Sequence, residues 1–332
     1  MEKLIELKDV KTSFFTHLGE VQAVRGVSYS LNKGEALGIV GESGSGKSIT
    51  SMSIMGLLQY PGVVKSGEIV FKGEDLLKKD KKEMRSVRGN EIAMIFQDPM
   101  TSLNPVYTVG DQIMEAIRKH QNVSKAEALE KAIEMLTLVG IPDPVKRVKS
   151  YPHEFSGGMR QRVMIAIALS CEPDLLIADE PTTALDVTIQ AQILDLMKEL
   201  KDKLNTSIVL ITHDLGVVAD VCSRVLVMYG GLIMEEGKVE DIFYNPKHPY
   251  TVGLLKSIPK IENKERLVPI DGTPPDLLHP PKGCPFAARC EHAMNVCMEE
   301  RPEFFQCGEG HKSMCWLLHP DAPKTELKGG VR

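Results

Sequence analysis

Two glycine-rich turns in this sequence have residue types that bind phosphate. The first is Gly41-Glu42-Ser43-Gly44-Ser45-Gly46-Lys47-Ser48, which has a fitting residue at every fixed position of the P-loop pattern. In such a loop the backbone N–H groups surround the phosphates, Lys47 reaches the β and γ oxygens, and the Ser48 hydroxyl binds Mg²⁺. The second is Ser156-Gly157-Gly158, where a capping serine precedes a predicted helix that begins with two glycines. Because a helix N-terminus attracts anions, the sequence predicts two phosphate-binding turns.

An apolar run at residues 175–178 ends in two adjacent carboxylates, Asp179 and Glu180. A buried pair of carboxylates is costly unless a cation offsets the charge. We therefore expect Asp179 to bind the Mg²⁺ of the P-loop and Glu180 to polarise the attacking water. Taken alone, such a pair is more typical of a strand that reaches solvent. Its position after the second glycine-rich turn favours the catalytic interpretation.

The elements that must position these residues alternate between strands and helices. The P-loop lies between a buried strand at residues 36–40 and a helix at 48–58, as its mechanism requires. A helical region at 112–140 contains a capping box, Ser124 with Glu127. Further predicted features are a helix stop at Gly140, an amphipathic helix at 186–205, strands at 208–211 and 224–228, and a tight turn at Gly230-Gly231. This alternation predicts an α/β fold whose sheet is mainly parallel, with helices on its faces.

Together these motifs resemble those of the ATP-binding cassette ATPases, over roughly residues 1–257. Ser156-Gly157-Gly158 is similar to the family signature, and Ala184-Leu185-Asp186 to its D-loop. Met159 stands where glutamine is usual, which matters little because the signature acts through the serine hydroxyl and the glycine N–H groups. The resemblance implies a RecA-like P-loop core with an antiparallel β subdomain. It also implies a helical subdomain at about residues 98–170, of which residues 99–109 contact a membrane partner.

The resemblance also assigns residues to nucleotide binding and hydrolysis. Phe14 resembles the aromatic residue that stacks on adenine, with Phe15 as its rival. Gln97 resembles the Q-loop glutamine, which contacts Mg²⁺ and water, and His213 resembles the switch histidine; both act with Glu180 in hydrolysis. The residues assigned to Mg²⁺ are Ser48, Gln97 and Asp179. Those assigned to the nucleotide are these three with Gly41, Ser43, Gly44, Ser45, Gly46, Lys47, Ile49, Ser156, Gly157 and Gly158.

Composition agrees with an ATPase that carries a second domain. A chain of 332 residues is long enough for two domains. Hydrophobic residues make up 42% and charged residues 26%, and the net charge of −5 indicates no nucleic-acid partner. The longest uninterrupted apolar run, residues 163–169, is too short to cross a bilayer. We therefore expect any membrane role to depend on partner chains.

The composition changes after about residue 257, where prolines mark an irregular linker. Five of the seven cysteines follow it, at positions 284, 290, 297, 307 and 315, whereas Cys171 and Cys222 lie in the core sequence. In a cytosolic chain such a cluster suggests a metal rather than disulfides. The spacing lacks the Cys-x-x-Cys motif common in zinc sites, but zinc stays open on spacing alone.

Several C-terminal segments narrow the resemblance to the dipeptide and oligopeptide importer branch, which also includes nickel importers. These segments are His248-Pro249-Tyr250-Thr251, Gly272-Thr273-Pro274-Pro275, Gly283-Cys284-Pro285-Phe286 and Arg289-Cys290. The branch implies a C-terminal domain at residues 258–332 with a [4Fe-4S] cluster, and Zn²⁺ is the alternative metal. The resemblance places the fourth ligand at the cysteine before Trp316 and leaves Cys307 as a surplus thiol. The implied ligands are Cys284, Cys290, Cys297 and Cys315.

This branch also implies partners and a location. Two related ATPase subunits pair head to tail, as a heterodimer or as a homodimer in isolation. ATP on the P-loop of one subunit then meets Ser156 and Gly158 of the other. Two transmembrane permease subunits and an external solute-binding protein complete the transporter, with the ATPases on the cytoplasmic face of the membrane.

The expected function is therefore ATP hydrolysis that drives import of dipeptides or oligopeptides. A nickel-importer ATPase of the same branch is one alternative. A soluble cassette ATPase acting on nucleic acid or ribosomes is another, although such proteins usually carry two cassettes or a long coiled-coil insertion. A P-loop kinase is disfavoured because the signature and His213 have no role there. The partner chains, rather than this sequence, select the transported solute.

Overall fold

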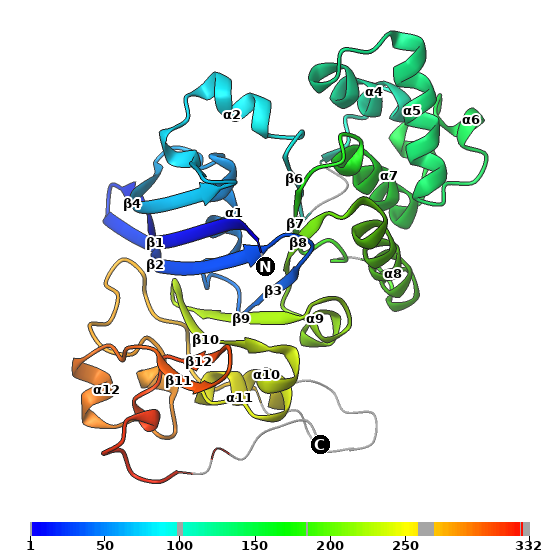
Figure 1. Ribbon diagram of the computed structural model, residues 1–332. Coiled ribbons are helices and arrows are strands. Elements are labelled where there is room, and N and C mark those ends of the chain that lie inside the picture. The colour runs from blue at the N-terminus through cyan, green and yellow to red at the C-terminus, as the bar shows by residue number, and fades with distance from the viewer. Residues whose placement is uncertain (1, 98–101, 184, 258–268, 326, 328–332) are drawn as a thin grey trace. The chain divides into compact units, whose positions relative to one another are not determined.

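The computed structural model describes residues 2–97, 102–183, 185–257, 269–325 and 327 (Figure 1). The chain forms two compact units that interleave in sequence. The first comprises Met1–Leu4, Leu31–Ala36 and Lys78–Ile211, and the second comprises Ile5–Ser30, Leu37–Leu77 and Thr212–Arg332. The predicted boundary near residue 257 stays a prediction, because residues 258–268 lie outside the described residues.

Three parallel strands run through the first unit in the order β8-β7-β6. Their bounds are Ile92–Ile95 for β6, Leu175–Asp179 for β7 and Ser207–Ile211 for β8. Every residue of β7 and β8 is buried, as expected for parallel strands covered on both faces. The strand predicted to end in the acidic pair is confirmed, and Asp179 is its last residue.

The first unit contains several helices. These are α4 (Val109–His120), α5 (Lys125–Leu138), α6 (Pro144–Arg147), α7 (Gly157–Leu169) and α8 (Val187–Leu204), and the short α2 (Lys81–Val87) precedes β6. The predicted capping box of Ser124 and Glu127 is confirmed, and it begins α5. Gly140, with φ of 74°, follows the end of that helix in the left-handed conformation expected of a stop.

The second unit contains an antiparallel sheet with strand order β2-β1-β4-β5. Its strands are β1 (Lys3–Thr16), β2 (Gly19–Asn32), β4 (Gly62–Phe71) and β5 (Glu74–Asp75). Strand β1 pairs with β4 in antiparallel register, with Ile5 opposite Phe71. This sheet is the antiparallel β subdomain that the resemblance implies.

A further set of strands in the second unit has the order β11-β12-β10-β9-β3. Their bounds are Ala36–Val40 for β3, Arg224–Tyr229 for β9, Leu232–Lys238 for β10, Phe305–Gly308 for β11 and His311–Ser313 for β12. Strands β3 and β9 are parallel, and β9 and β10 form the predicted hairpin at Gly230-Gly231. The C-terminal strand β12 pairs with β10, and His311 Nε2 lies 2.8 Å from Glu235 Oε1 in a fully buried contact. The C-terminal region therefore extends the sheet that contains β3 and β9.

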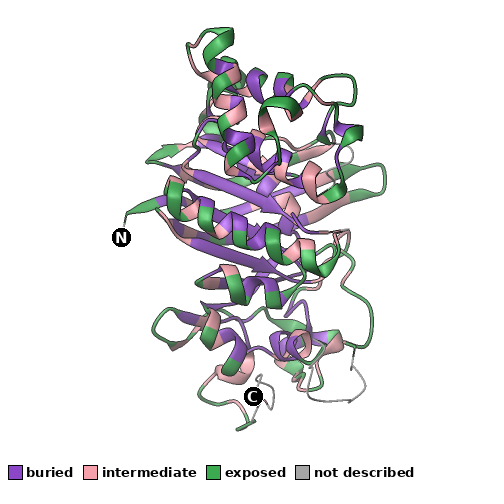
Figure 2. Cartoon of the chain, turned by 90° about the vertical axis from the view of Figure 1, so that its right-hand side faces the viewer, coloured by how far each residue is buried: buried purple, intermediate pink, exposed green. Residues whose placement is uncertain are grey.

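Helices of the second unit are α1 (Lys47–Met55), α9 (Leu215–Val221), α10 (Val239–Tyr244), α11 (Pro249–Lys256) and α12 (Asn295–Glu299). Helix α1 ends three residues earlier than predicted, because Gly56 adopts a left-handed conformation (φ 56°) that closes it. Figure 2 shows buried strands covered by helices whose outer turns are exposed. In the part of the chain that the structure describes, no helix has both the length and the apolar character needed to cross a membrane.

Candidate functional site

The first glycine-rich turn has the geometry of a P-loop. Strand β3 is fully buried and ends at Val40, and α1 begins at Lys47. Added Cβ atoms would lie 2.1 Å from Met228 O at Gly41 and 2.7 Å from Ala23 O at Gly46, so both positions require glycine. At Gly44 a Cβ would meet nothing within 4 Å, and Ser43 and Gly44 are exposed. The loop therefore offers an open backbone surface to an anion.

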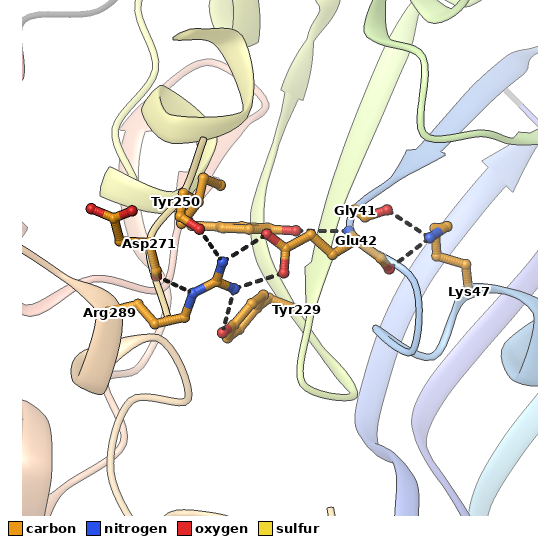
Figure 3. Close-up of polar contacts among 8 residues, drawn as sticks. Gly41, Glu42, Lys47, Tyr229, Tyr250, Asp271 and Arg289 are labelled. Carbon is orange, nitrogen blue, oxygen red and sulfur yellow. Dashed lines mark hydrogen bonds and ion pairs between the residues drawn. The ribbon is translucent and has the colours of Figure 1, made fainter. Parts of the chain in front are cut away.

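Lys47 is held against the backbone at the beginning of this loop. Its side chain is buried, and its Nζ donates hydrogen bonds to Gly41 O at 2.6 Å and Glu42 O at 2.9 Å (Figure 3). Ser48 and Ile49 follow in the first turn of α1 and are partly exposed. A buried ammonium beside exposed backbone N–H groups is a donor set that fits the phosphates of a nucleotide.

The two candidate adenine-stacking residues lie on opposite faces of β1. Thr12 is fully buried, and its Oγ1 lies 2.9 Å from Ser53 Oγ of α1. Phe14, two residues further along the strand, shares that face. Phe15 is 49% exposed on the other face, where the Lys65 ammonium lies 5.9 Å from its ring centre. Phe14, and not Phe15, therefore lies on the face of β1 that is turned toward α1, the helix that follows the P-loop.

In the first unit the acidic pair meets the predicted Q-loop residue. Asp179 is 5% exposed at the end of β7. The Glu180 carboxylate accepts hydrogen bonds from Gln97 Nε2 at 3.0 Å and Thr183 Oγ1 at 2.9 Å. Glu180 has a φ of 48°, and its backbone N–H donates to Ile211 O at 2.8 Å. This left-handed conformation costs roughly 1–2 kcal/mol for a residue other than glycine, and it is associated with functional sites.

The signature turn lies at the exposed N-terminus of α7. The Ser156 side chain caps the helix by accepting a hydrogen bond from Met159 N at 3.4 Å, and both Ser156 and Gly157 are exposed. A Cβ at Gly158 would lie 2.6 Å from Ile189 Cγ2 of α8, so close helix packing requires glycine there. The predicted second anion-binding turn is therefore accessible at a helix N-terminus.

The remaining motif residues lie in both units. Asp186 of the D-loop caps α8 by accepting from Ile189 N at 3.0 Å, and Ala184 lies outside the described residues. His213 follows β8 and is exposed in the second unit, which also contains the P-loop. Gln97, the acidic pair and the signature belong to the first unit.

Four of the C-terminal cysteines form a group. Cys284, Cys297 and Cys315 are buried, and Cys284 N donates to Cys297 O at 2.8 Å. Burial, together with the nearby Cys284, Cys290 and Cys297, raises the pKa of the Cys315 thiol to about 12. Burial likewise raises the pKa of Cys284 to about 12, with contributions from Cys297 and Cys290. The four predicted ligands therefore lie within electrostatic reach of one another.

Cys307 does not belong to this group. It lies on β11, and its Sγ contacts Phe305 O at 3.5 Å. Burial raises the pKa of this thiol, and the nearby Glu235 carboxylate contributes in the same direction. Among the described residues, no three or more His, Cys, Asp or Glu side chains are arranged to hold a single metal ion. The arrangement of these side chains therefore does not support the expected [4Fe-4S] cluster. The structure shows only that the four thiols lie near one another.

Sequence reasoning gave no role to the residues that surround Glu42. Arg289 forms an ion pair with Glu42 at 2.7 Å, and Tyr250 Oη accepts a hydrogen bond from Glu42 N at 2.8 Å (Figure 3). Tyr250 and Arg289 belong to the segments that indicated the importer branch. Their contacts with Glu42 could not be predicted, because contacts between residues more than 200 positions apart leave no local pattern in a sequence.

Comparisons with known proteins agree with this geometry. The family described as "ABC transporter" matches residues 24–183, and "Oligopeptide/dipeptide transporter, C-terminal region" matches residues 234–297. The chain is 61% identical to the oligopeptide transport ATP-binding protein OppD of Bacillus subtilis, over 99% of this chain and 93% of that protein. It is 58% identical to the dipeptide transport ATP-binding protein DppD of the same organism, over the full length of both.

Solved structures show the same fold. The ATP-binding cassette MJ0796, in a dimeric post-hydrolysis state bound to ADP and Pi, is 28% identical with a TM-score of 0.64, covering 71% of this chain and 99% of that one. CbiO1 of Clostridium perfringens, part of an ABC transporter complex, is 26% identical with a TM-score of 0.63, covering 73% of this chain and 91% of that one. The chain therefore belongs to the ATP-binding cassette ATPases of ABC transporters and carries the C-terminal region typical of the oligopeptide and dipeptide branch.

Proposed function

We propose that this chain is the ATP-hydrolysing subunit of an importer of dipeptides or oligopeptides. The observation that carries the hydrolytic part is the hydrogen bond between Gln97 Nε2 and Glu180 Oε2, which joins two independently predicted catalytic residues. The full-length relatives with peptide-transport names support the substrate class. A nickel-importer ATPase remains the second candidate within the same branch.

The proposed chemistry is transfer of the γ-phosphoryl group of ATP to water. Bound Mg²⁺, held by Ser48, Asp179 and Gln97, would neutralise charge on the phosphates. The buried carboxylate of Asp179 and the partly exposed hydroxyl of Ser48 are oxygen ligands that suit this ion. Glu180 accepts a proton from the attacking water, while Gln97 orients the carboxylate and the water. His213 contributes to hydrolysis as the switch histidine.

The P-loop supplies most of the nucleotide contacts in this proposal. Lys47 neutralises the β and γ phosphate oxygens, and the N–H groups of Ser43, Gly44, Ser45 and Gly46 cradle them. Phe14 stacks on the adenine, which is favoured by its place on the face of β1 that also contacts α1. Gly41 is the first residue of the loop, and Ile49 follows the loop in the first turn of α1.

The proposal includes a head-to-tail dimer with a second, related ATPase subunit, or with a second copy when the chain is isolated. In this arrangement Ser156, Gly157 and Gly158 bind the nucleotide held by the partner's P-loop. The exposure of Ser156 and Gly157 at the start of α7 and the dimeric state of the solved MJ0796 cassette support it. Two permease subunits, an external binding protein and a position on the cytoplasmic face complete the proposed assembly. Residues 99–109 would contact a permease, although residues 98–101 lie outside the described residues.

A Ser156→Arg substitution tests the dimer. We expect ATP binding by the substituted chain to stay within about twofold, whereas turnover at the site of the partner's P-loop falls about 100-fold, because the anion-binding turn is blocked. Hydrolysis is measured after mixing the variant with wild-type partner. Ser124→Arg is the matched control, because it removes another exposed N-cap serine at similar cost to its helix. Loss of ATP binding by the isolated Ser156 variant would instead show that this residue acts in its own subunit.

The C-terminal group is proposed to hold a [4Fe-4S] cluster through Cys284, Cys290, Cys297 and Cys315. Burial raises the pKa of the Cys284 and Cys315 thiols, so both are uncharged at neutral pH, and a bound metal would convert them to thiolates. Four cysteine thiolates are the usual ligands of a [4Fe-4S] cluster and also of a tetrahedral Zn²⁺ site, so Zn²⁺ is the alternative metal.

Metal analysis tests this part of the proposal. Anaerobically purified protein is expected to contain iron and sulfide and to be coloured, and Cys315→Ser should remove the colour. Cys307→Ser is the matched control and should keep it, because that thiol lies apart from the other four. One zinc per colourless chain would eliminate the cluster, and loss of colour only with Cys307→Ser would reassign the fourth ligand.

A further inference from the structure

Arg289 of the C-terminal region binds the second residue of the P-loop. It ends the short 3-10 helix Ala287–Arg289, one residue before Cys290. Its Nη1 donates to Glu42 Oε2 at 2.7 Å and its Nη2 to Glu42 Oε1 at 3.1 Å, so the contact is bidentate (Figure 3). The Arg289 side chain is 5% exposed and that of Glu42 25% exposed, which places the pair largely out of water.

The other N–H groups of Arg289 have partners as well. Nη1 also donates to Tyr229 Oη at 3.0 Å, Nη2 to Ile270 O at 2.8 Å, and Nε to Asp271 O at 2.8 Å. With the two bonds to Glu42, these contacts use all five donors of a guanidinium group. A lysine ammonium has three donors and no planar fork, so it cannot reproduce the arrangement.

A cluster of aromatic rings holds the same P-loop residue from a second direction. Tyr250 Oη accepts from the backbone N–H of Glu42 at 2.8 Å, and the ring centres of Tyr229 and Tyr250 are 4.5 Å apart. The Phe286 ring lies 5.4 Å from Tyr229 and 5.3 Å from Tyr250. Both the side chain and the backbone of Glu42 are thus fixed by residues far from it in sequence.

The position of Glu42 in turn determines where the Lys47 ammonium lies. Lys47 Nζ donates to the carbonyl groups of Gly41 and Glu42, which are the residues at the beginning of the loop. If Glu42 shifts, the acceptors of Lys47 shift with it. Moreover, a Glu42 carboxylate without its partner would place an unneutralised negative charge beside the site for the ATP phosphates.

We propose that Arg289 is a positioning residue for ATP binding: its bidentate contact with Glu42 fixes the beginning of the P-loop and neutralises the carboxylate beside the phosphates. The C-terminal region then supports the nucleotide site in addition to its proposed role in metal binding. The inference rests on ATP binding at the P-loop and does not depend on the cysteine cluster.

The first test compares Arg289→Gln and Arg289→Lys in the full-length chain. A fluorescent ATP analogue reports affinity, and steady-state hydrolysis in the assembled transporter reports KM and kcat. Arg289→Gln is expected to weaken ATP affinity about tenfold and to raise KM equally, with kcat within about twofold, because the contact acts on binding. Arg289→Lys keeps the positive charge but not the bidentate fork, so it should weaken affinity by a smaller factor. Arg224→Lys is the matched control: it alters another largely buried arginine–carboxylate pair, with Glu236 at 2.7 Å, outside the P-loop. It should lower thermal stability without changing ATP affinity.

A double-mutant cycle separates positioning from a purely structural role. If Arg289 acts through Glu42, adding Glu42→Gln to Arg289→Gln removes the unpaired charge, so the double variant binds ATP no more weakly than Arg289→Gln alone. Additive losses of affinity, or lowered melting temperatures with unchanged affinity, would overturn the proposal. Failure of the wild-type chain to bind ATP would contradict the proposed function instead, so the two failures are distinguishable.

Discussion

A Glu180→Gln chain is expected to bind MgATP within about twofold of wild type and to hydrolyse it about a thousandfold more slowly. The carboxylate accepts hydrogen bonds from Gln97 Nε2 and Thr183 Oγ1, and a glutamine keeps the size and one accepting oxygen. It cannot take a proton from water, so the substitution removes the chemical function and leaves the surrounding contacts largely in place. Single-turnover hydrolysis and nucleotide titration on the same preparation measure both quantities.

Glu199→Gln is the matched control for this variant. Glu199 is an exposed carboxylate on α8 in the same unit, so its substitution makes the same change of charge and should leave turnover unchanged. Near-normal hydrolysis by the Glu180 variant would remove this residue from the catalytic role. An equal loss in both variants would point to a general effect of charge on the unit.

The second large effect is expected for Lys47→Ala, which should weaken ATP binding about 100-fold, or ~2.7 kcal/mol. The Lys47 ammonium is buried against Gly41 O and Glu42 O, where it can approach phosphates without a competing layer of water. Alanine removes that cation and leaves the two carbonyl groups without their donor. Titration with a fluorescent ATP analogue measures the change.

Lys65→Ala serves as the control for charge. Lys65 lies in β4 of the same unit and forms an exposed ion pair with Glu20 at 2.7 Å, a kind of contact that contributes little to stability. Its loss should not alter ATP affinity. Unchanged affinity in the Lys47 variant would contradict the assignment of this turn as the nucleotide-binding loop.

The parts of the fold predicted from sequence are those with strong local signals. The P-loop follows from a buried apolar strand, glycines at positions that exclude a Cβ, and a helix that begins at Lys47. The cap at Ser124 likewise marks the beginning of α5. The end of α4 at His120 was not predicted, because Gln121, whose extended conformation closes the helix, is not a typical helix stop.

The contacts that escaped prediction join segments far apart in the chain. Strand β12 has only three residues, so alternation along it carries almost no information, yet it pairs with β10 and is fixed by the buried contact between His311 and Glu235. The ion pair between Arg289 and Glu42 similarly spans most of the sequence. Such pairings arise from tertiary packing, which propensity and spacing within one segment do not encode.

The central claim, that this chain hydrolyses ATP to drive peptide import, is tested most directly by transport. The complex is purified from membranes through a tag on this chain and reconstituted in liposomes with ATP on the side of the ATPase. Uptake of a labelled dipeptide, a longer labelled peptide and radioactive nickel is then measured, with Glu180→Gln as the inactive reference. We predict peptide uptake by the wild-type complex that is lost in the variant. Nickel uptake without peptide uptake, or recovery of ribosomes or nucleic acid with no permease, would contradict the account.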